Sequence, residues 1–218
     1  MNEENIGRIL SLIERHTKKL GPPTSELANK LYRDPFKVLV STMLSARTKD
    51  EVTEKAIRNL FSKADGWRDI EKMDLGEIEK LVYPVNFYKT KARHLKELSA
   101  ILGREFGGKV PDTLEDLTSL PGVGRKTANI VLNVSFKKHA IGVDTHVHQI
   151  LNRLGYVKTK TPEETEMELI KKLPKRYWRK INANLVLFGQ SVCVPVSPFC
   201  SRCPVSKFCL RIGVTKSR

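Results

Sequence analysis

Apolar residues recur every three or four positions along most of the chain, the spacing of one face of an α-helix. Two such segments follow helix-start signals: Asp34-Pro35, and a candidate capping box at residues 48–51, Thr-Lys-Asp-Glu. Further helices are predicted at residues 75–82 and at about 90–106, the second ending at Gly107-Gly108. Alternation typical of strands is almost absent, so the pattern predicts an all-α fold.

A pair of closely spaced glycines separates two more predicted helices. Leucines at positions 114, 117 and 120 predict a short helix that ends at Pro121, and another helix is predicted from about Arg125. Between them, Gly122-Val123-Gly124 allows a tight hairpin with outward-pointing amides, which can bind a phosphate oxygen beside a helix N-terminus. A plain connection between helices is the alternative, and the adjoining Arg125 and Lys126 favour the anion site.

Charge indicates the kind of partner. The 218 residues include 39 Lys and Arg against 24 Asp and Glu, a formal net charge of +15. Such an excess is typical of proteins that bind nucleic acid, although a soluble or heat-adapted charged surface is an alternative. No run of 18 apolar residues occurs, so we expect no membrane span. The length suits one large domain or two small ones.

All four cysteines lie near the end of the chain, as Cys193-x6-Cys200-x2-Cys203-x5-Cys209. The chain starts without an apolar signal segment, so we expect a reducing cytoplasm, where disulfides are disfavoured and thiolates bind metal. Structural zinc usually has two close ligand pairs, and here only one pair is close. The spacing therefore favours an iron–sulfur cluster, with zinc, or no metal at all, as alternatives.

Three features together resemble the endonuclease III family of DNA repair glycosylases. They are residues 120–128, Leu-Pro-Gly-Val-Gly-Arg-Lys-Thr-Ala, then residues 143–147, Val-Asp-Thr-His-Val, and the four-cysteine loop. The resemblance covers about Asp34 to Cys209. It implies a four-iron four-sulfur (4Fe-4S) cluster held by Cys193, Cys200, Cys203 and Cys209.

The resemblance also implies two helical domains and an activity. A six-helix barrel carrying the helix–hairpin–helix motif would occupy residues 28–138, and residues 1–27 and 139–218 would form the cluster domain. The implied enzyme is a bifunctional DNA glycosylase and abasic-site (AP) lyase of base excision repair. It would remove oxidised pyrimidines flipped out of the duplex into the cleft between the domains, and cut 3′ to the abasic site by β-elimination.

Lys126 and Asp144 are the expected catalytic residues. Lys126 lies in the first turn of a helix beside Arg125, where the helix dipole, the neighbouring charge and partial burial would all favour a neutral, nucleophilic amine. Asp144 is a good helix N-cap on sequence alone. The resemblance gives the matching aspartate a catalytic role, which is compatible with capping: it would stabilise positive charge on the sugar and assist proton transfer.

Two residues depart from the family pattern. Arg47 stands where glutamine commonly fills the gap left by the extruded base, and Phe87 stands where a leucine wedge is expected. Both could keep these roles with altered fine specificity. His148 is expected to be structural. The full set of expected DNA contacts is Arg47, Phe87, Lys91, Gly122, Val123, Gly124, Arg125, His146, Arg202 and Lys207.

Other members of the superfamily, which act on adenine or thymine mismatches, resemble this chain but typically lack a lysine at position 126. Lys126 therefore favours the oxidised-pyrimidine branch. A DNA-binding protein without catalytic activity is an alternative from another class, and the presence of both Lys126 and Asp144 argues against it. We expect a monomer that acts on damaged double-stranded DNA in the cytoplasm, associated with the nucleoid in a prokaryote.

Overall fold

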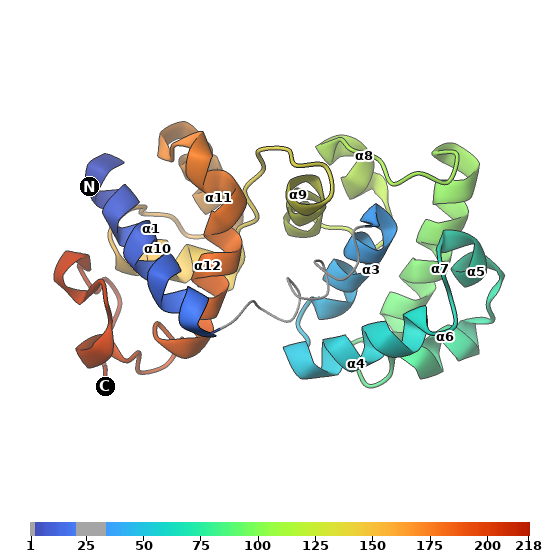
Figure 1. Ribbon diagram of the computed structural model, residues 1–218, viewed down its shortest axis with the longest axis horizontal. Coiled ribbons are helices and arrows are strands. Elements are labelled where there is room, and N and C mark those ends of the chain that lie inside the picture. Colours follow the sequence, from blue (N-terminus) through green and yellow to red (C-terminus); the bar gives the residue numbers. More distant parts are fainter. Residues whose placement is uncertain (1–2, 21–33) are drawn as a thin grey trace. The chain divides into compact units, whose positions relative to one another are not determined.

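The computed structural model describes residues 3–20 and 34–218, and within these ranges the regular structure is helical with no strand. The described residues form two compact units, one of residues 3–20 with 139–218 and one of residues 34–138 (Figure 1). The predicted all-α class is confirmed. The predicted domain boundary at residue 28 lies outside the described residues. No helix of the described part is long and apolar enough to cross a membrane.

The unit of residues 34–138 contains the helix pairs predicted around the glycine hairpin and the first capping signal. Asp34 caps its first helix as expected, because its carboxylate accepts a hydrogen bond from the Phe36 amide at 2.7 Å. The helix before Pro121 and the helix from Arg125 are also confirmed. The helices are α3 (Pro35–Ser45), α4 (Asp50–Phe61), α5 (Trp67–Lys72), α6 (Leu75–Val82), α7 (Tyr88–Glu105), α8 (Leu114–Ser119) and α9 (Arg125–Val134).

The predicted capping box at residues 48–51 is wrong. Helix α4 does begin at Asp50, but its N-cap residue is Lys49 and no side chain caps it. The Thr48 hydroxyl instead accepts hydrogen bonds from the Lys91 ammonium and the Asn86 amide, both at 3.2 Å. The Thr48 hydroxyl oxygen, which the local sequence predicts as a helix cap, therefore accepts tertiary hydrogen bonds instead.

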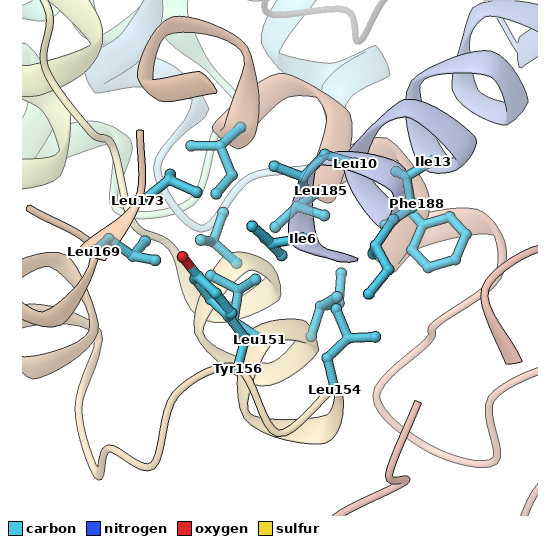
Figure 2. Close-up of a cluster of buried hydrophobic side chains, with 14 of the residues drawn as sticks. Ile6, Leu10, Ile13, Leu151, Leu154, Tyr156, Leu169, Leu173, Leu185 and Phe188 are labelled. Carbon is cyan, nitrogen blue, oxygen red and sulfur yellow. The ribbon is translucent and has the colours of Figure 1, made fainter. Parts of the chain in front are cut away.

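The unit of residues 3–20 and 139–218 joins the first helix to the last third of the chain. Figure 2 shows Ile6, Leu10 and Ile13 of the first helix among side chains such as Leu185 and Phe188. Fully burying each such side chain contributes about 1.5–3 kcal/mol. The elements are α1 (Glu3–Thr17), η1 (Lys18–Leu20), α10 (Thr145–Arg153), α11 (Pro162–Lys172), η2 (Lys175–Tyr177), α12 (Trp178–Ser191), η3 (Cys200–Arg202) and η4 (Ser206–Phe208).

Candidate functional site

The glycine hairpin between α8 and α9 depends on Gly122. Its φ of +73° lies in the left-handed region, and a Cβ there would come within 2.6 Å of His94 Nδ1 and 3.0 Å of Met43 Cε. The Val123 amide closes the turn by donating to the Leu120 carbonyl at 3.1 Å. Val123 is buried, whereas Gly122 and Gly124 are exposed. The turn thus presents backbone at the surface and anchors itself through one side chain. His94 is part of this support, and no sequence motif marked it.

Lys126 lies in the first turn of α9, directly after the hairpin. Gly124 is the N-cap residue of this helix and provides no side-chain hydrogen bond. Helix N-terminal amides and the helix dipole favour a bound anion at such a position. Arg125 and Lys126 are both exposed. The exposure of Lys126 differs from the partial burial expected from the sequence, and it leaves the side chain accessible to a large substrate.

Asp144 is the N-cap residue of α10, as the sequence predicts. Its Oδ1 accepts a hydrogen bond from the Val147 amide at 2.9 Å, and the residue is half-buried. A carboxylate bonded in this way has a fixed direction, so the helix start positions the group. Asp144 belongs to the unit of residues 139–218 and Lys126 to that of residues 34–138. The catalytic roles expected for both stay predictions.

The two histidines of α10 have different surroundings. His146 packs against α12, because a Cβ at Gly189 would come within 2.4 Å of its Nδ1. A DNA contact by His146 stays a prediction. His148 Nδ1 lies 2.7 Å from the Thr165 hydroxyl. That bond supports the structural role expected for His148.

Arg47 and Phe87 form a pair on the unit of residues 34–138. The Arg47 guanidinium lies over the Phe87 ring, 5.1 Å from its centroid, and both side chains are exposed. Both backbones are in the left-handed region, with φ of 56° and 59°. Asn86 links the two loops by donating from Nδ2 to the Arg47 carbonyl. Arg47, expected to fill the gap left by the extruded base, and Phe87, the expected wedge, are therefore neighbours. Asn86, which the sequence did not single out, connects their loops.

Lys91 is buried beneath this pair, with 9% of its surface exposed. Its ammonium donates to the carbonyls of Leu44 at 2.8 Å and Ala46 at 2.7 Å, and to the Thr48 hydroxyl. Burial lowers the pKa of Lys91 to about 8. A direct DNA contact by Lys91 stays a prediction, but its ammonium already has three protein partners.

The four cysteines line a single cavity in the loop after α12. Its other lining residues include Arg153, Phe199 and Arg211. All four are free cysteines, and the prolines between them leave only the short turns η3 and η4. Within the described ranges, no three His, Cys, Asp or Glu side chains gather as a group that could hold a metal ion. The cavity nevertheless has all four cysteines of the chain among its lining residues.

Donors from the protein point at these sulfurs. Arg153 Nη1 lies 3.4 Å from Cys193 Sγ, and the Arg211 amide lies 3.4 Å from Cys209 Sγ. Burial raises the pKa of the Cys203 thiol to about 11 and also raises the pKa values of Cys193 and Cys209. Hydrogen bonds to sulfur are typical around iron–sulfur clusters, and ligation would release the protons that burial holds on the thiols. The donor set fits four-thiolate ligation.

Arg202 and Lys207 lie in the same loop and are exposed. The Arg202 guanidinium stacks on the Phe199 ring, 3.8 Å from its centroid, which fixes its position beside the cavity. Their accessibility suits phosphate contacts, which stay predictions for both.

Residues 40–175 match the family model described as "HhH-GPD superfamily base excision DNA repair protein". Endonuclease III of Thermotoga maritima is 52% identical over 170 residues, covering 78% of this chain and 80% of that protein. Endonuclease III-like protein 1 of Gallus gallus is 44% identical over 171 residues, covering 77% of this chain and 61% of that protein.

Solved structures give the same relationship at the level of the fold. A trapped endonuclease III–DNA covalent intermediate matches with a TM-score of 0.86 and 32% identity, covering 96% of each chain. A thermostable thymine-DNA glycosylase matches with a TM-score of 0.80 and 27% identity, covering 94% of this chain and 93% of that one. The chain belongs to the endonuclease III family within the HhH-GPD superfamily of base excision DNA repair proteins.

Proposed function

We propose that this base excision repair DNA glycosylase and AP lyase uses Lys126 as the nucleophile that removes oxidised pyrimidines from duplex DNA. The observation that carries the proposal is the place of Lys126: an exposed amine in the first turn of α9, directly after the Gly122–Gly124 hairpin. A hairpin that binds a backbone phosphate would hold the sugar near this amine. The solved relative trapped as a covalent intermediate with DNA supports a covalent route.

The reaction would pass through a covalent intermediate between Lys126 and the sugar. The neutral Lys126 amine forms a bond to the sugar C1′, the glycosidic bond breaks, and the departing base takes the electron pair and a proton. Opening of the sugar ring leaves a Schiff base on Nζ. Its positive charge acidifies C2′, so a proton leaves C2′ and the C3′–O bond breaks with its electron pair going to the 3′ phosphate. Water then releases the sugar from the lysine.

Asp144 is the proposed partner in these proton transfers. Its carboxylate would stabilise the positive charge that develops on the sugar as the base departs. Because the Val147 amide fixes Oδ1, the group keeps its direction without reorganisation during the reaction.

The cofactor we propose is a 4Fe-4S cluster ligated by Cys193, Cys200, Cys203 and Cys209. The shared cavity and the N–H groups directed at two of the sulfurs support it. Bound there, the cluster would act as a crosslink between the two ends and the middle of the loop that follows α12. Analysis of the purified protein should find about four iron and four sulfide per chain, and a zinc-loaded protein without iron would contradict the assignment.

Borohydride trapping tests the nucleophile. The wild-type protein, mixed with a thymine-glycol duplex and sodium borohydride, should give a covalent protein–DNA adduct, because reduction of the Schiff base makes the link permanent. Lys126→Ala should give none. Lys137→Ala is a matched control, since Lys137 is exposed and its ammonium caps the other end of α9 by donating to the Val134 carbonyl at 2.7 Å. An adduct that persists in Lys126→Ala would overturn the assignment.

A panel of duplexes tests the substrate class. We expect excision of oxidised pyrimidines to exceed excision of thymine from a thymine·guanine mismatch, the substrate class suggested by the thymine-DNA glycosylase match. The endonuclease III–DNA complexes are consistent with the expected monomer on damaged DNA. Because the substrate is DNA, we propose that the protein works in the cytoplasm, associated with the nucleoid if the source is a prokaryote.

A further inference from the structure

We propose that Lys91 is a positioning residue that clamps the Arg47 and Phe87 loops into one preassembled wedge, so that the pair enters the DNA as a unit. This inference rests on the proposed function, because a wedge is needed where a base leaves the stack. It assigns Lys91 a role through protein contacts in place of a phosphate contact.

Lys91 reaches both loops through two different groups. Its backbone amide donates to the Phe87 carbonyl at 3.0 Å, in the first turn of α7. Its ammonium donates to the Ala46 carbonyl at 2.7 Å, on the peptide bond that enters Arg47. The bond to Phe87 is an ordinary α-helical one that any residue here would make, so the part specific to lysine is the ammonium, which reaches the Arg47 loop through Ala46 and Thr48.

A second set of bonds connects the loops to each other. The Thr48 hydroxyl accepts from Lys91 Nζ and from the Asn86 amide, and Asn86 Nδ2 donates to the Arg47 carbonyl. Thr48 follows Arg47 in the chain and Asn86 precedes Phe87. The residues adjoining the pair are therefore bonded across the gap between the loops.

The pair itself is held in an unfavourable backbone conformation. Arg47 and Phe87 both have positive φ, a strained conformation for a non-glycine residue that persists only where surrounding contacts enforce it. The Lys91 and Asn86 bonds are such contacts. Both side chains are exposed, and the guanidinium lies over the ring at 5.1 Å from its centroid, so the pair is already assembled before DNA is bound.

The chain contains a matched control on the same helix. Lys96, further along α7, donates from its ammonium to the carbonyls of Glu71 and Met73 and so caps the end of α5. It is the same residue type in the same role, but it holds neither wedge loop. Lys91→Met and Lys96→Met each remove an ammonium that donates to two carbonyls, and Lys91→Met also removes the bond to the Thr48 hydroxyl, so only Lys91→Met should release the wedge.

The test separates base extrusion from the later chemistry. A duplex with one thymine glycol beside 2-aminopurine is bound in a Lys126→Ala background, where the aminopurine fluorescence rises when the stack opens. Lys91→Met should reduce this rise. In a protein that retains Lys126, Lys91→Met should also slow thymine-glycol excision about tenfold or more, as expected for a misplaced positioning group. Lys96→Met should leave both within about threefold of the parent. Borohydride trapping on a preformed abasic duplex should stay within about threefold in every variant that retains Lys126, because no base remains to be extruded.

Other outcomes have distinct meanings. Equal behaviour of Lys91→Met and Lys96→Met overturns the clamp. Weaker binding of Lys91→Met to undamaged duplex, with a salt slope reduced by about one, also overturns it in favour of a phosphate contact. If Lys91→Met does not fold, Thr48→Val decides, since it removes the shared acceptor and should lower the fluorescence rise in the same direction. If the wild type makes no adduct and excises nothing, the proposed function fails, and the fluorescence response alone still decides the clamp.

Discussion

Arg153 Nη1 lies 3.4 Å from Cys193 Sγ, and the same buried guanidinium donates to the carbonyls of Val194 and Pro195 at 2.9 and 2.7 Å. One side chain of α10 therefore fixes both a sulfur and the backbone that follows it. Arg153→Met should lower the free energy of unfolding by on the order of 3 kcal/mol, because it removes the charged donor of several hydrogen bonds from a buried position. We expect iron content per chain to fall as well, measured by metal analysis beside thermal denaturation.

Arg202 is the control for that prediction. It lies in the cysteine loop but is exposed, and its guanidinium stacks on Phe199. Arg202→Met should keep the full iron content while weakening DNA binding and reducing the salt slope by about one, as expected for loss of one phosphate contact. Equal loss of iron in both variants would show that the loop depends on its overall charge instead of on the buried Arg153 contacts.

The two hairpin glycines should respond differently to alanine. Gly122 has a positive φ and a crowded Cβ position, so Gly122→Ala should destabilise the protein by about 1–3 kcal/mol. Gly124 has a φ of −85° and nothing within 4 Å of a Cβ, so Gly124→Ala should cost less than about 1 kcal/mol. Urea denaturation measures both.

The affinity of Gly124→Ala for duplex DNA tests whether the hairpin binds a phosphate. If the exposed turn grips a phosphate through its backbone, the added methyl of Gly124→Ala weakens duplex binding without a matching loss of stability. A Gly124→Ala protein that binds the duplex with unchanged affinity would remove the hairpin from the DNA-binding surface.

Local signals in the sequence predicted the helix ends that depend on local contacts. Asp34, Pro121 and Asp144 act within a few residues of their own position, so their roles follow from the sequence. Thr48 fails as a cap because its hydroxyl bonds to residues about forty positions away. No local pattern contains that information.

In the candidate site, too, roles set by local sequence could be predicted and roles set by distant contacts could not. The motif around Lys126 and the cysteine spacing were readable because each is a short continuous segment. The roles of Lys91, Arg153 and His94 could not be predicted, because each depends on contacts with a segment far away in the sequence. A lysine in a basic chain predicts a surface charge, whereas this lysine is buried against the end of α3.

Capping and catalysis by Asp144 can be separated with two substitutions. Asp144→Asn keeps an N-cap oxygen for the Val147 amide and removes the negative charge, while Asp144→Ala removes both. We expect Asp144→Ala to lose about 1 kcal/mol of stability and Asp144→Asn to lose little. Both should slow excision of thymine glycol by about a hundredfold. Activity that follows stability, with Asp144→Asn fully active, would assign Asp144 to structure alone.

The stability contributed by Lys91 should depend on pH. Burial lowers its folded-state pKa from 10.5 to about 8, so between these values the unfolded chain binds more protons at this position than the folded one. The free energy of unfolding of the wild type relative to Lys91→Met should therefore rise with pH across this window, by on the order of 1–3 kcal/mol. Well below pH 8 the difference should be constant, since Lys91 is then protonated in both states. Urea denaturation of the two proteins at pH 7, 9 and 10 measures it. A difference that stays flat across the window would mean that the three acceptors around the ammonium offset its burial and keep the charged form.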